Sequence, residues 1–372
     1  MSFQEIGVHD IHNLQERILI DVRSPGEFAE GTIPGAVNVP LFTDEERAMI
    51  GTVYKRESPA AARRLAMLTV SPKIPQLVEQ MEPLLAQGEL VIFCWRGGMR
   101  SFAACTFMDL LKYPVRRLKG GYRAYRQMVI DYLDVYKGLT APLIVLHGMT
   151  GVGKTRILQL LQERGQQVLD LEGMANHRGS VFGAIGLGEP HNQKTFDSLL
   201  FEELRLLDPS RPVYMEAESR RIGRSVMPEW LDRDKKAGLH VLIEAPMNKR
   251  VDRLFEDYIP HQNEAVQAGL AEALLSIQKR IRREDFEEMR DKLENKRYEE
   301  FCEQILGLYY DPKYRHKLAS YDGEILTVDA TDLDRAVAEL ERLGGQLIEQ
   351  GDLAGYRQGL TEGLKERGVL LP

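Results

Sequence analysis

The segment 148–155, GMTGVGKT, constrains the fold of this chain more than any other feature of the sequence. It matches the pattern G-x-x-x-x-G-K-[ST] at every fixed position, and it lies between an apolar run at 143–146 and helical apolar spacing at 155–163. Glycines in such a loop let backbone N–H groups surround phosphate oxygens, and the following helix contributes its N-terminal dipole. The segment therefore predicts a phosphate-binding loop at one edge of an α/β sheet.

The candidate phosphate-binding residues of this loop are Gly148, Gly151, Gly153, Lys154 and Thr155. In loops of this kind the lysine neutralises phosphate charge and the threonine hydroxyl binds Mg²⁺. Glu216 follows the apolar run at 213–215 and is the candidate acid beside the metal, with Asp170 and Glu172 as alternatives. The pattern predicts binding of a phosphate or diphosphate, but it specifies neither a nucleoside nor hydrolysis.

Short apolar runs alternate with helical stretches through the chain, which predicts an α/β fold with mostly parallel sheets. The expected strands are residues 18–20, 37–39, 90–93, 143–146, 168–171, 213–217, 241–245 and 325–328. A length of 372 residues suggests two domains. We place them at 1–138 and 139–372, with a connection over 131–140. Residues 251–321 are densely charged and helical in pattern, which predicts a helical lobe within the P-loop NTPase-like second domain.

Cys94 stands directly after the apolar run at 90–93 and just before a helical pattern at 101–112. The loop between them has two arginines and two glycines, namely Arg96, Gly97, Gly98 and Arg100. The glycines let successive N–H groups point inward, and the arginines add charge that favours a thiolate. Cys94 is therefore predicted to be a nucleophile. Cys105, on an apolar helix face, and Cys302, in a charged helix, are predicted to be structural.

The segment DVRSPGEFAEGTIPGAVNVP at 21–40, followed by the Cys94 loop, resembles a rhodanese domain over roughly residues 5–130. The resemblance implies an N-terminal rhodanese-like domain in which Cys94 takes up sulfur as a persulfide. The four loop residues match those that wrap the sulfur in this family. The span between Pro40 and Leu90 is longer and more helical than in a minimal rhodanese domain.

Two further polar stretches, 172–183 and 216–224, are expected at the carboxyl edge of the second sheet, where open α/β sheets bind ligands. Ordinary polar loops are the alternative interpretation. The candidates there for contacts to a substrate or leaving group are His177, Arg178, Glu216, Arg220 and Arg221.

A rhodanese-like domain before a P-loop domain with the motifs EGMANHRGS and ESRRIG closely resembles the tRNA 2-selenouridine synthase family, over essentially the whole chain. The resemblance implies a transferase that replaces the sulfur of wobble 2-thiouridine in tRNA by selenium from selenophosphate. It also implies S-geranyl-2-thiouridine, made from geranyl diphosphate, as the intermediate. Implied partners are the tRNA anticodon region and an enzyme supplying selenophosphate; Mg²⁺ is expected, without a tightly bound metal.

The charge distribution bears on tRNA binding. The net charge is −7, yet residues 96–126 contain eight basic residues against one acidic residue, Asp109. This basic segment is one candidate tRNA surface, and the helical lobe is another. The N-terminus has no export-signal pattern and no apolar run is long enough to span a membrane, so a cytoplasmic protein without membrane contact is expected.

Two other functions fit the same motifs. One is a rhodanese-type sulfurtransferase fused to an ATP-dependent kinase or ligase, which would consume nucleotide. The other is a nucleotide-gated binding module built on an inert rhodanese fold. The intact Cys94 in its glycine loop disfavours the second, because an inert fold needs no thiol.

Overall fold

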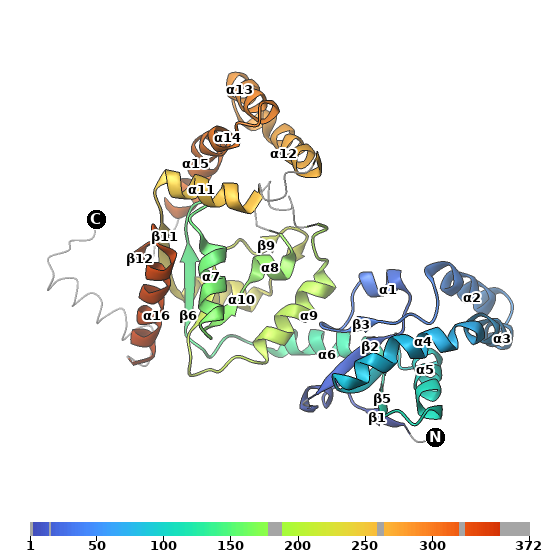
Figure 1. Cartoon of the computed structure of the whole chain (residues 1–372). Coiled ribbons are helices and arrows are strands. Elements are labelled where there is room, and N and C mark those ends of the chain that lie inside the picture. The colour runs from blue at the N-terminus through green and yellow to red at the C-terminus, as the bar shows by residue number, and fades with distance from the viewer. Residues whose placement is uncertain (1–2, 15, 178–187, 259–263, 320–323, 350–372) are drawn as a thin grey trace. The chain divides into compact units, whose positions relative to one another are not determined.

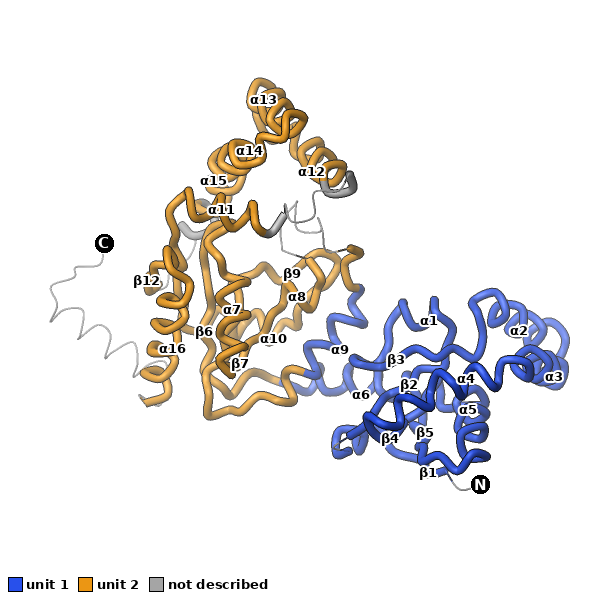
Figure 2. Tube along the Cα trace, in the orientation of Figure 1, with its two compact units in different colours: residues 1–136, 192–202 blue, residues 137–191, 203–372 orange. Residues whose placement is uncertain are grey.

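The computed structural model describes residues 3–14, 16–177, 188–258, 264–319 and 324–349. The chain forms two compact units (Figure 2). The first contains Met1–Tyr136 and also Asn192–Glu202, and the second contains Lys137–His191 and Glu203–Pro372. The later part of the chain therefore contributes one segment to the first unit. Within the described residues, no helix has the length and apolar character to cross a membrane.

The first unit is built on a five-stranded sheet in the order β1-β5-β4-β2-β3, in which every neighbouring pair is parallel. The strands are β1 (Gln4–Ile6), β2 (Arg17–Asp21), β3 (Val37–Asn38), β4 (Glu89–Phe93) and β5 (Val115–Leu118). Its α-helices are α1 (Pro25–Ala29), α2 (Asp44–Arg56), α3 (Pro59–Val70), α4 (Ile74–Met81), α5 (Met99–Leu110), α6 (Gly121–Val135) and most of α9 (Gln193–Leu204). Short 3₁₀ turns cover Ile11–Asn13, Ser71–Lys73 and Glu82–Ala86.

The central strand β4 is apolar along its length because it is buried on both faces. Strands β1 and β5 were not expected from the sequence, since β5 is apolar only at its ends and has Arg116 and Arg117 between them. The connection predicted over 131–140 starts later, because α6 continues to Val135 with Leu133 buried.

The second unit has a five-stranded parallel sheet in the order β12-β11-β6-β8-β7. Figure 1 labels three neighbouring strands of this sheet, β12, β11 and β6. The strands are β6 (Leu143–His147), β7 (Gln167–Leu169), β8 (Val213–Glu216), β11 (Leu239–Glu244) and β12 (Ile325–Asp329), and a hairpin pairs β9 (Arg221–Ile222) with β10 (Ser225–Val226). The helices around it are α7 (Lys154–Glu163), α8 (Leu171–Ala175), α10 (Glu229–Ala237) and α16 (Leu333–Glu349). The predicted α/β class with parallel sheets is confirmed.

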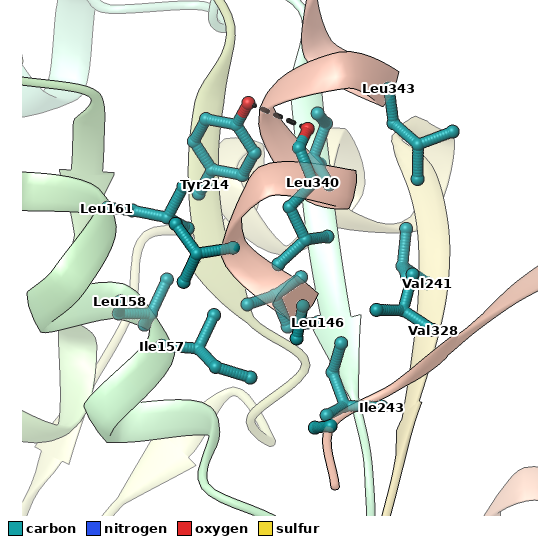
Figure 3. Packing of buried hydrophobic residues seen from close by; sticks show 14 of the residues in the cluster. Leu146, Ile157, Leu158, Leu161, Tyr214, Val241, Ile243, Val328, Leu340 and Leu343 are labelled. Atoms are coloured by element: carbon teal, nitrogen blue, oxygen red, sulfur yellow. Dashed lines mark hydrogen bonds between the residues drawn. The ribbon is translucent and has the colours of Figure 1, made fainter. Parts of the chain in front are cut away.

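The core of the second unit joins the central strands to helices α7 and α16 (Figure 3). Leu146, Val241 and Ile243 from the strands pack with Leu158 of α7 and Leu340 of α16. The buried Tyr214 hydroxyl donates to the carbonyl of Leu340 at 3.1 Å, which satisfies the phenol inside an otherwise apolar region. This packing fixes β6 and α7, the two elements between which segment 148–155 lies.

The region between β11 and β12 is helical, as predicted. It contains α11 (Met247–Tyr258), α12 (Glu264–Ile277), a 3₁₀ turn (Gln278–Arg280), α13 (Arg283–Glu294), α14 (Tyr298–Ile305), a π-helical turn (Leu306–Tyr310) and α15 (Asp311–Ala319). The lobe has a hydrophobic core of its own, in which Leu274, Phe286 and Phe301 are buried.

Candidate active site

Cys94 follows β4 directly, and its loop turns into α5 at Gly98. Gly97 has φ of 62°, a conformation that favours glycine. The start of α6 holds this loop, because the N–H of Tyr122 donates to the Cys94 carbonyl at 2.9 Å. A Cβ on Gly121 would lie 2.0 Å from that carbonyl oxygen, so only glycine fits this contact. The sequence motif therefore forms a tightly constrained loop.

The Cys94 side chain is buried, and its Sγ lies 3.3 Å from the Ser101 hydroxyl oxygen. The Ser101 hydroxyl donates to the Gly98 carbonyl at 3.2 Å. Rotation of that one hydroxyl would direct its proton to the sulfur instead, and thus stabilise a thiolate or a chalcogen bound to it. Ser101 was not singled out from the sequence, because a serine in the first turn of a helix is common.

The two loop arginines differ. Arg100 forms an ion pair with Glu27 at 2.5 Å, whereas the Arg96 side chain is exposed. Burial raises the pKa of Glu27, but hydrogen bonding to Arg100 outweighs it and the pKa is lowered. Arg100 thus connects the loop to α1 and its charge is largely balanced. Of the two, Arg96 is the one whose charge is available to an anion.

The other two cysteines lie in apolar surroundings. Burial raises the pKa of the Cys105 thiol to about 12, and that of Cys302 to about 12 as well. Both thiols therefore stay protonated at neutral pH, which agrees with the structural roles predicted for them.

The segment 148–155 forms a loop that joins β6 to the first turn of α7. Its three glycines have positive φ values, which favour glycine: 154° at Gly148, 82° at Gly151 and 94° at Gly153. A Cβ on Gly151 would lie 2.8 Å from a backbone oxygen, that of Arg250. The Lys154 ammonium donates to the Gly148 carbonyl at 2.8 Å, across the mouth of the loop. The geometry is that of a cradle of backbone groups closed by a lysine.

This loop is also held by two arginines on the side of the lobe, which no sequence motif marks. Arg250 donates to the carbonyl of Thr150 at 2.9 Å, and Arg253 donates to that of Val152 at 2.6 Å. Arg250 is itself buried in an ion pair with Asp311 at 2.6 Å. With its carbonyls bound from outside, the loop can keep its N–H groups turned inward.

A carboxylate cluster stands beside the lysine. Glu172, Glu216 and Glu218 each offer an oxygen, and these oxygens lie within 4.8 Å of one another. Glu216 is fully buried; its Oε1 accepts from the Thr155 hydroxyl at 3.1 Å, and its Oε2 has no hydrogen-bond partner. Burial and the neighbouring carboxylates raise the pKa of Glu172 and that of Glu216. Such a set of oxygens suits a divalent cation, which would remove this repulsion.

Comparisons with known proteins cover both units. Residues 141–341 match the family model of the tRNA 2-selenouridine synthase AAA domain, and residues 8–128 match the model of the rhodanese-like domain. The tRNA 2-selenouridine synthase of Pseudomonas fluorescens is 31% identical over 99% of both chains. That of Nitrosomonas europaea is 31% identical, over 84% of this chain and 93% of the relative. The chain belongs to the tRNA 2-selenouridine synthase family.

Family membership agrees with the predicted N-terminal rhodanese-like and C-terminal P-loop domains. Among solved structures, a rhodanese-related protein from Thermoplasma volcanium is 18% identical over 34% of this chain and 93% of its own, with a TM-score of 0.22.

In this member of the tRNA 2-selenouridine synthase family, the stretch after β7 approaches the carboxylate cluster. The N–H of His177 donates to the carbonyl of Glu172 at 3.0 Å, and its ring packs against Gly223. Burial lowers the pKa of His177. Arg178 lies outside the described residues. Arg220 and Arg221 are exposed on the segment around the β9–β10 hairpin.

The basic segment 96–126 is less cationic than its composition suggests. Four of its eight cations pair with acids: Arg100 with Glu27, Arg116 with Glu89, Arg117 with Glu5 and Arg126 with Asp197. The other four are exposed and form no salt bridge with the described residues, although Lys119 is near enough to Glu5 to help lower the pKa of that acid: Arg96, Lys112, Lys119 and Arg123. In the lobe, Arg282 and Arg297 also pair with nearby acids.

Proposed function

We propose that this chain makes 2-selenouridine in tRNA, the product for which its relatives are named, and that it does so in two steps assigned to its two loops. The observation that carries the proposal is the presence of a constrained cysteine loop and a phosphate cradle on one chain of this family. We assign the selenium chemistry to residues 1–138 and the diphosphate chemistry to residues 139–372.

In the first step the sulfur of 2-thiouridine attacks C1 of geranyl diphosphate. A C–S bond forms, the C1–O bond breaks with its electron pair on diphosphate, and the base loses its N3 proton, which gives S-geranyl-2-thiouridine. Gly151, Gly153 and Lys154 would bind the leaving diphosphate, because preorganised N–H groups and a cation stabilise charge that develops there. Gly148, whose N–H donates to the Tyr314 hydroxyl, would shape the loop that binds it. Arg220 and Arg221 are further candidates for this contact.

In the second step the selenium of selenophosphate attacks C2 of the base. The C2–Se bond forms, geranyl thiolate leaves and takes up a proton, and water then cleaves the Se–P bond to release phosphate. Cys94 would position the selenium for this attack, with Gly97, Gly98 and Ser101 supplying hydrogen bonds and Arg96 attracting the selenophosphate anion. Another enzyme would supply the selenophosphate.

Mg²⁺ fits the residues beside the loop. The unpartnered oxygen of the buried Glu216 and the nearby carboxylates of Glu172 and Glu218 form a suitable oxygen set, to which Thr155 would add its hydroxyl. When bound, the ion supplies positive charge that stabilises the leaving diphosphate.

The tRNA is proposed to contact the exposed cations near the cysteine loop. Arg96 and Arg123 both belong to backbone that frames Cys94, since the N–H of Arg123 donates to the Trp95 carbonyl at 2.9 Å. Charge reversal at both should weaken binding of an anticodon stem–loop. For each phosphate that is no longer neutralised, the slope of log binding constant against log salt concentration should become shallower by about one. Reversal at Arg282 and Arg283 of the lobe is the matched comparison; if it weakens binding more, the lobe is the main surface.

The overall proposal is tested by incubating the purified chain with 2-thiouridine RNA, geranyl diphosphate and selenophosphate, and following the nucleosides by mass spectrometry. S-geranyl-2-thiouridine followed by 2-selenouridine is expected, without nucleotide. A requirement for ATP with release of ADP or AMP would favour the kinase or ligase alternative instead.

A further inference from the structure

A cavity of about 400 Å³ lies beside the phosphate-binding loop, wholly within the second unit. Two of its wall residues, Met149 and Val152, belong to the loop itself. Leu242–Pro246, at the end of β11, forms another wall, and Asp329 at the end of β12 lies at the same sheet edge. A ligand whose diphosphate lay in the loop would have its organic part next to this cavity.

Three of the four polar residues in the wall are already engaged by the protein; the fourth, Glu244, is exposed at the end of β11 and its carboxylate pairs with none of the described residues. Arg250 is bound to Asp311 and to the Thr150 carbonyl, and the Tyr314 hydroxyl oxygen accepts the Gly148 N–H at 2.5 Å. Oδ1 of Asp329 accepts from the N–H and the hydroxyl of Thr331, at 2.8 and 2.6 Å.

What the wall offers to a ligand is therefore mainly apolar. The apolar lining residues are Met149, Val152, Leu242, Ile243, Ala245 and Pro246. A nucleoside needs hydrogen-bonding groups directed at its base and ribose, whereas a hydrocarbon chain needs only this kind of surface. With six apolar residues among the ten that line it, the wall favours a prenyl diphosphate over a nucleoside diphosphate as the ester that the loop holds.

We propose that this cavity binds the hydrocarbon chain of the prenyl diphosphate. The inference rests on the proposed function and adds the location of the hydrocarbon chain and the residues that line its site. Affinity in such a pocket grows with the apolar area removed from water. A ten-carbon chain should consequently bind well, and a five-carbon chain should leave much of the apolar wall uncovered.

The test uses the full chain and compares Ala245→Trp, which fills the cavity, with Ala237→Trp, an exposed position at the end of α10 that does not line it. Initial rates of S-prenylation are measured with geranyl and dimethylallyl diphosphates on 2-thiouridine RNA. Ala245→Trp is expected to raise KM for geranyl diphosphate at least tenfold and KM for dimethylallyl diphosphate by less than threefold. Inhibition by inorganic diphosphate should be unchanged, and Ala237→Trp should behave as the unaltered chain.

A second variant keeps the inference testable if Ala245→Trp folds poorly. Met149→Ala enlarges the cavity and should shift the preference from geranyl towards the fifteen-carbon farnesyl diphosphate, seen as a rise of fivefold or more in the ratio of their kcat/KM values. Equal effects on short and long prenyl chains in both variants would overturn the assignment. So would loss of ATP binding in Ala245→Trp with unchanged geranylation, since that would identify a nucleoside pocket.

The two proposals fail in different ways. If the unaltered chain does not geranylate RNA at all, the proposed function is wrong. If the unaltered chain geranylates and both cavity variants match Ala237→Trp, only the location of the prenyl chain is wrong. Conversion of RNA that already carries S-geranyl-2-thiouridine to 2-selenouridine should proceed normally in every variant.

Discussion

The cysteine loop and the phosphate-binding loop are both glycine-containing turns between a parallel strand and a helix, yet they are held in different ways. The Cys94 carbonyl accepts the N–H of Tyr122, only 28 residues further along the chain, and Gly121 packs directly against it. The carbonyls of Thr150 and Val152 accept from side chains about a hundred residues away. The first loop depends on neighbouring backbone, and the second depends on charged side chains of the lobe.

This difference predicts that the two loops can be disabled separately. Backbone contacts make the cysteine loop a rigid holder for one reactive atom, whereas the phosphate-binding loop is coupled through Arg250 and Asp311 to α15. Substitutions in the lobe should therefore affect the diphosphate step and spare the selenium step.

The largest effect is expected for Lys154→Ala. Loss of the cation that faces the developing diphosphate charge should reduce geranylation about 10²- to 10³-fold. Selenation of RNA that already carries the S-geranyl group should stay within about twofold, because that step has no diphosphate. The measurement is single-turnover kinetics of each step on synthetic RNA.

Arg156→Ala serves as the control for Lys154→Ala, since Arg156 is exposed on the first turn of α7 and pairs only with surface groups. Normal geranylation in Lys154→Ala with failed selenation would reverse the assignment of the two steps.

The mirror experiment is Cys94→Ser, which keeps the shape of the loop but removes the thiol. Conversion of geranylated RNA to 2-selenouridine should fall about 10²-fold, and geranylation should be unchanged. Cys302→Ser is the control, because its thiol is protonated and distant in sequence from either loop. A Cys94→Ser variant that selenates at the normal rate would show that selenophosphate acts without help from the thiol.

An intermediate effect is expected for Arg250→Met, which tests the dependence on the lobe. It leaves Asp311 buried and unpaired, so the free energy of unfolding should fall by about 3–5 kcal/mol, as measured by denaturant titration. The Thr150 carbonyl loses its donor, so kcat/KM for geranyl diphosphate should fall on the order of tenfold or more.

A double variant separates these two consequences of losing Arg250. Arg250→Met with Asp311→Leu removes the unpaired charge and should recover much of the stability, but not the kcat/KM for geranyl diphosphate. Lys249→Met, an exposed neighbour on α11, is the control. Full recovery of activity in the double variant would mean that Arg250 acts on stability alone and does not position the loop.

The sequence was sufficient to predict those parts of the molecule that are formed by residues close together in the chain. Both loops, the strands before them and the helices after them could be predicted, because each of these segments lies within one short stretch of the chain, 90–112 or 143–163. The pairing of Thr155 with Glu216 was also within reach, since the ends of neighbouring parallel strands meet at one edge.

What could not be predicted is long-range. Arg250 and Arg253 are two charges in a charged helix, and no local pattern distinguishes them from solvated surface residues. The same limit explains the overestimated basic segment: the acids that pair with Arg116 and Arg117 lie on β4 and β1, far from them in the sequence. Composition counts charges, but the fold decides which of them remain available.

The smallest effect concerns the carboxylate cluster, which has no counterpart at the cysteine loop among the residues that the structure describes. Burial and the neighbouring acids raise the pKa of Glu172 above its ordinary value of 4.5, so the folded chain binds a proton that the unfolded chain releases. Stability should therefore fall as pH rises above about 5, by on the order of 1 kcal/mol per pH unit. Glu172→Gln removes this titration, and without divalent cations it should be increasingly more stable than the unaltered chain from pH 6 to pH 9.

Denaturant unfolding in the presence of a chelator, with Glu163→Gln on the surface of α7 as control, measures the effect. Adding Mg²⁺ should stabilise the unaltered chain more than Glu172→Gln, because the cation takes the place of the proton. The sign of the difference between the two chains should therefore reverse at alkaline pH when Mg²⁺ is added. If Mg²⁺ stabilises both chains equally, Glu172 is not a ligand, and the remaining candidate ligands are Glu216, Glu218 and Thr155.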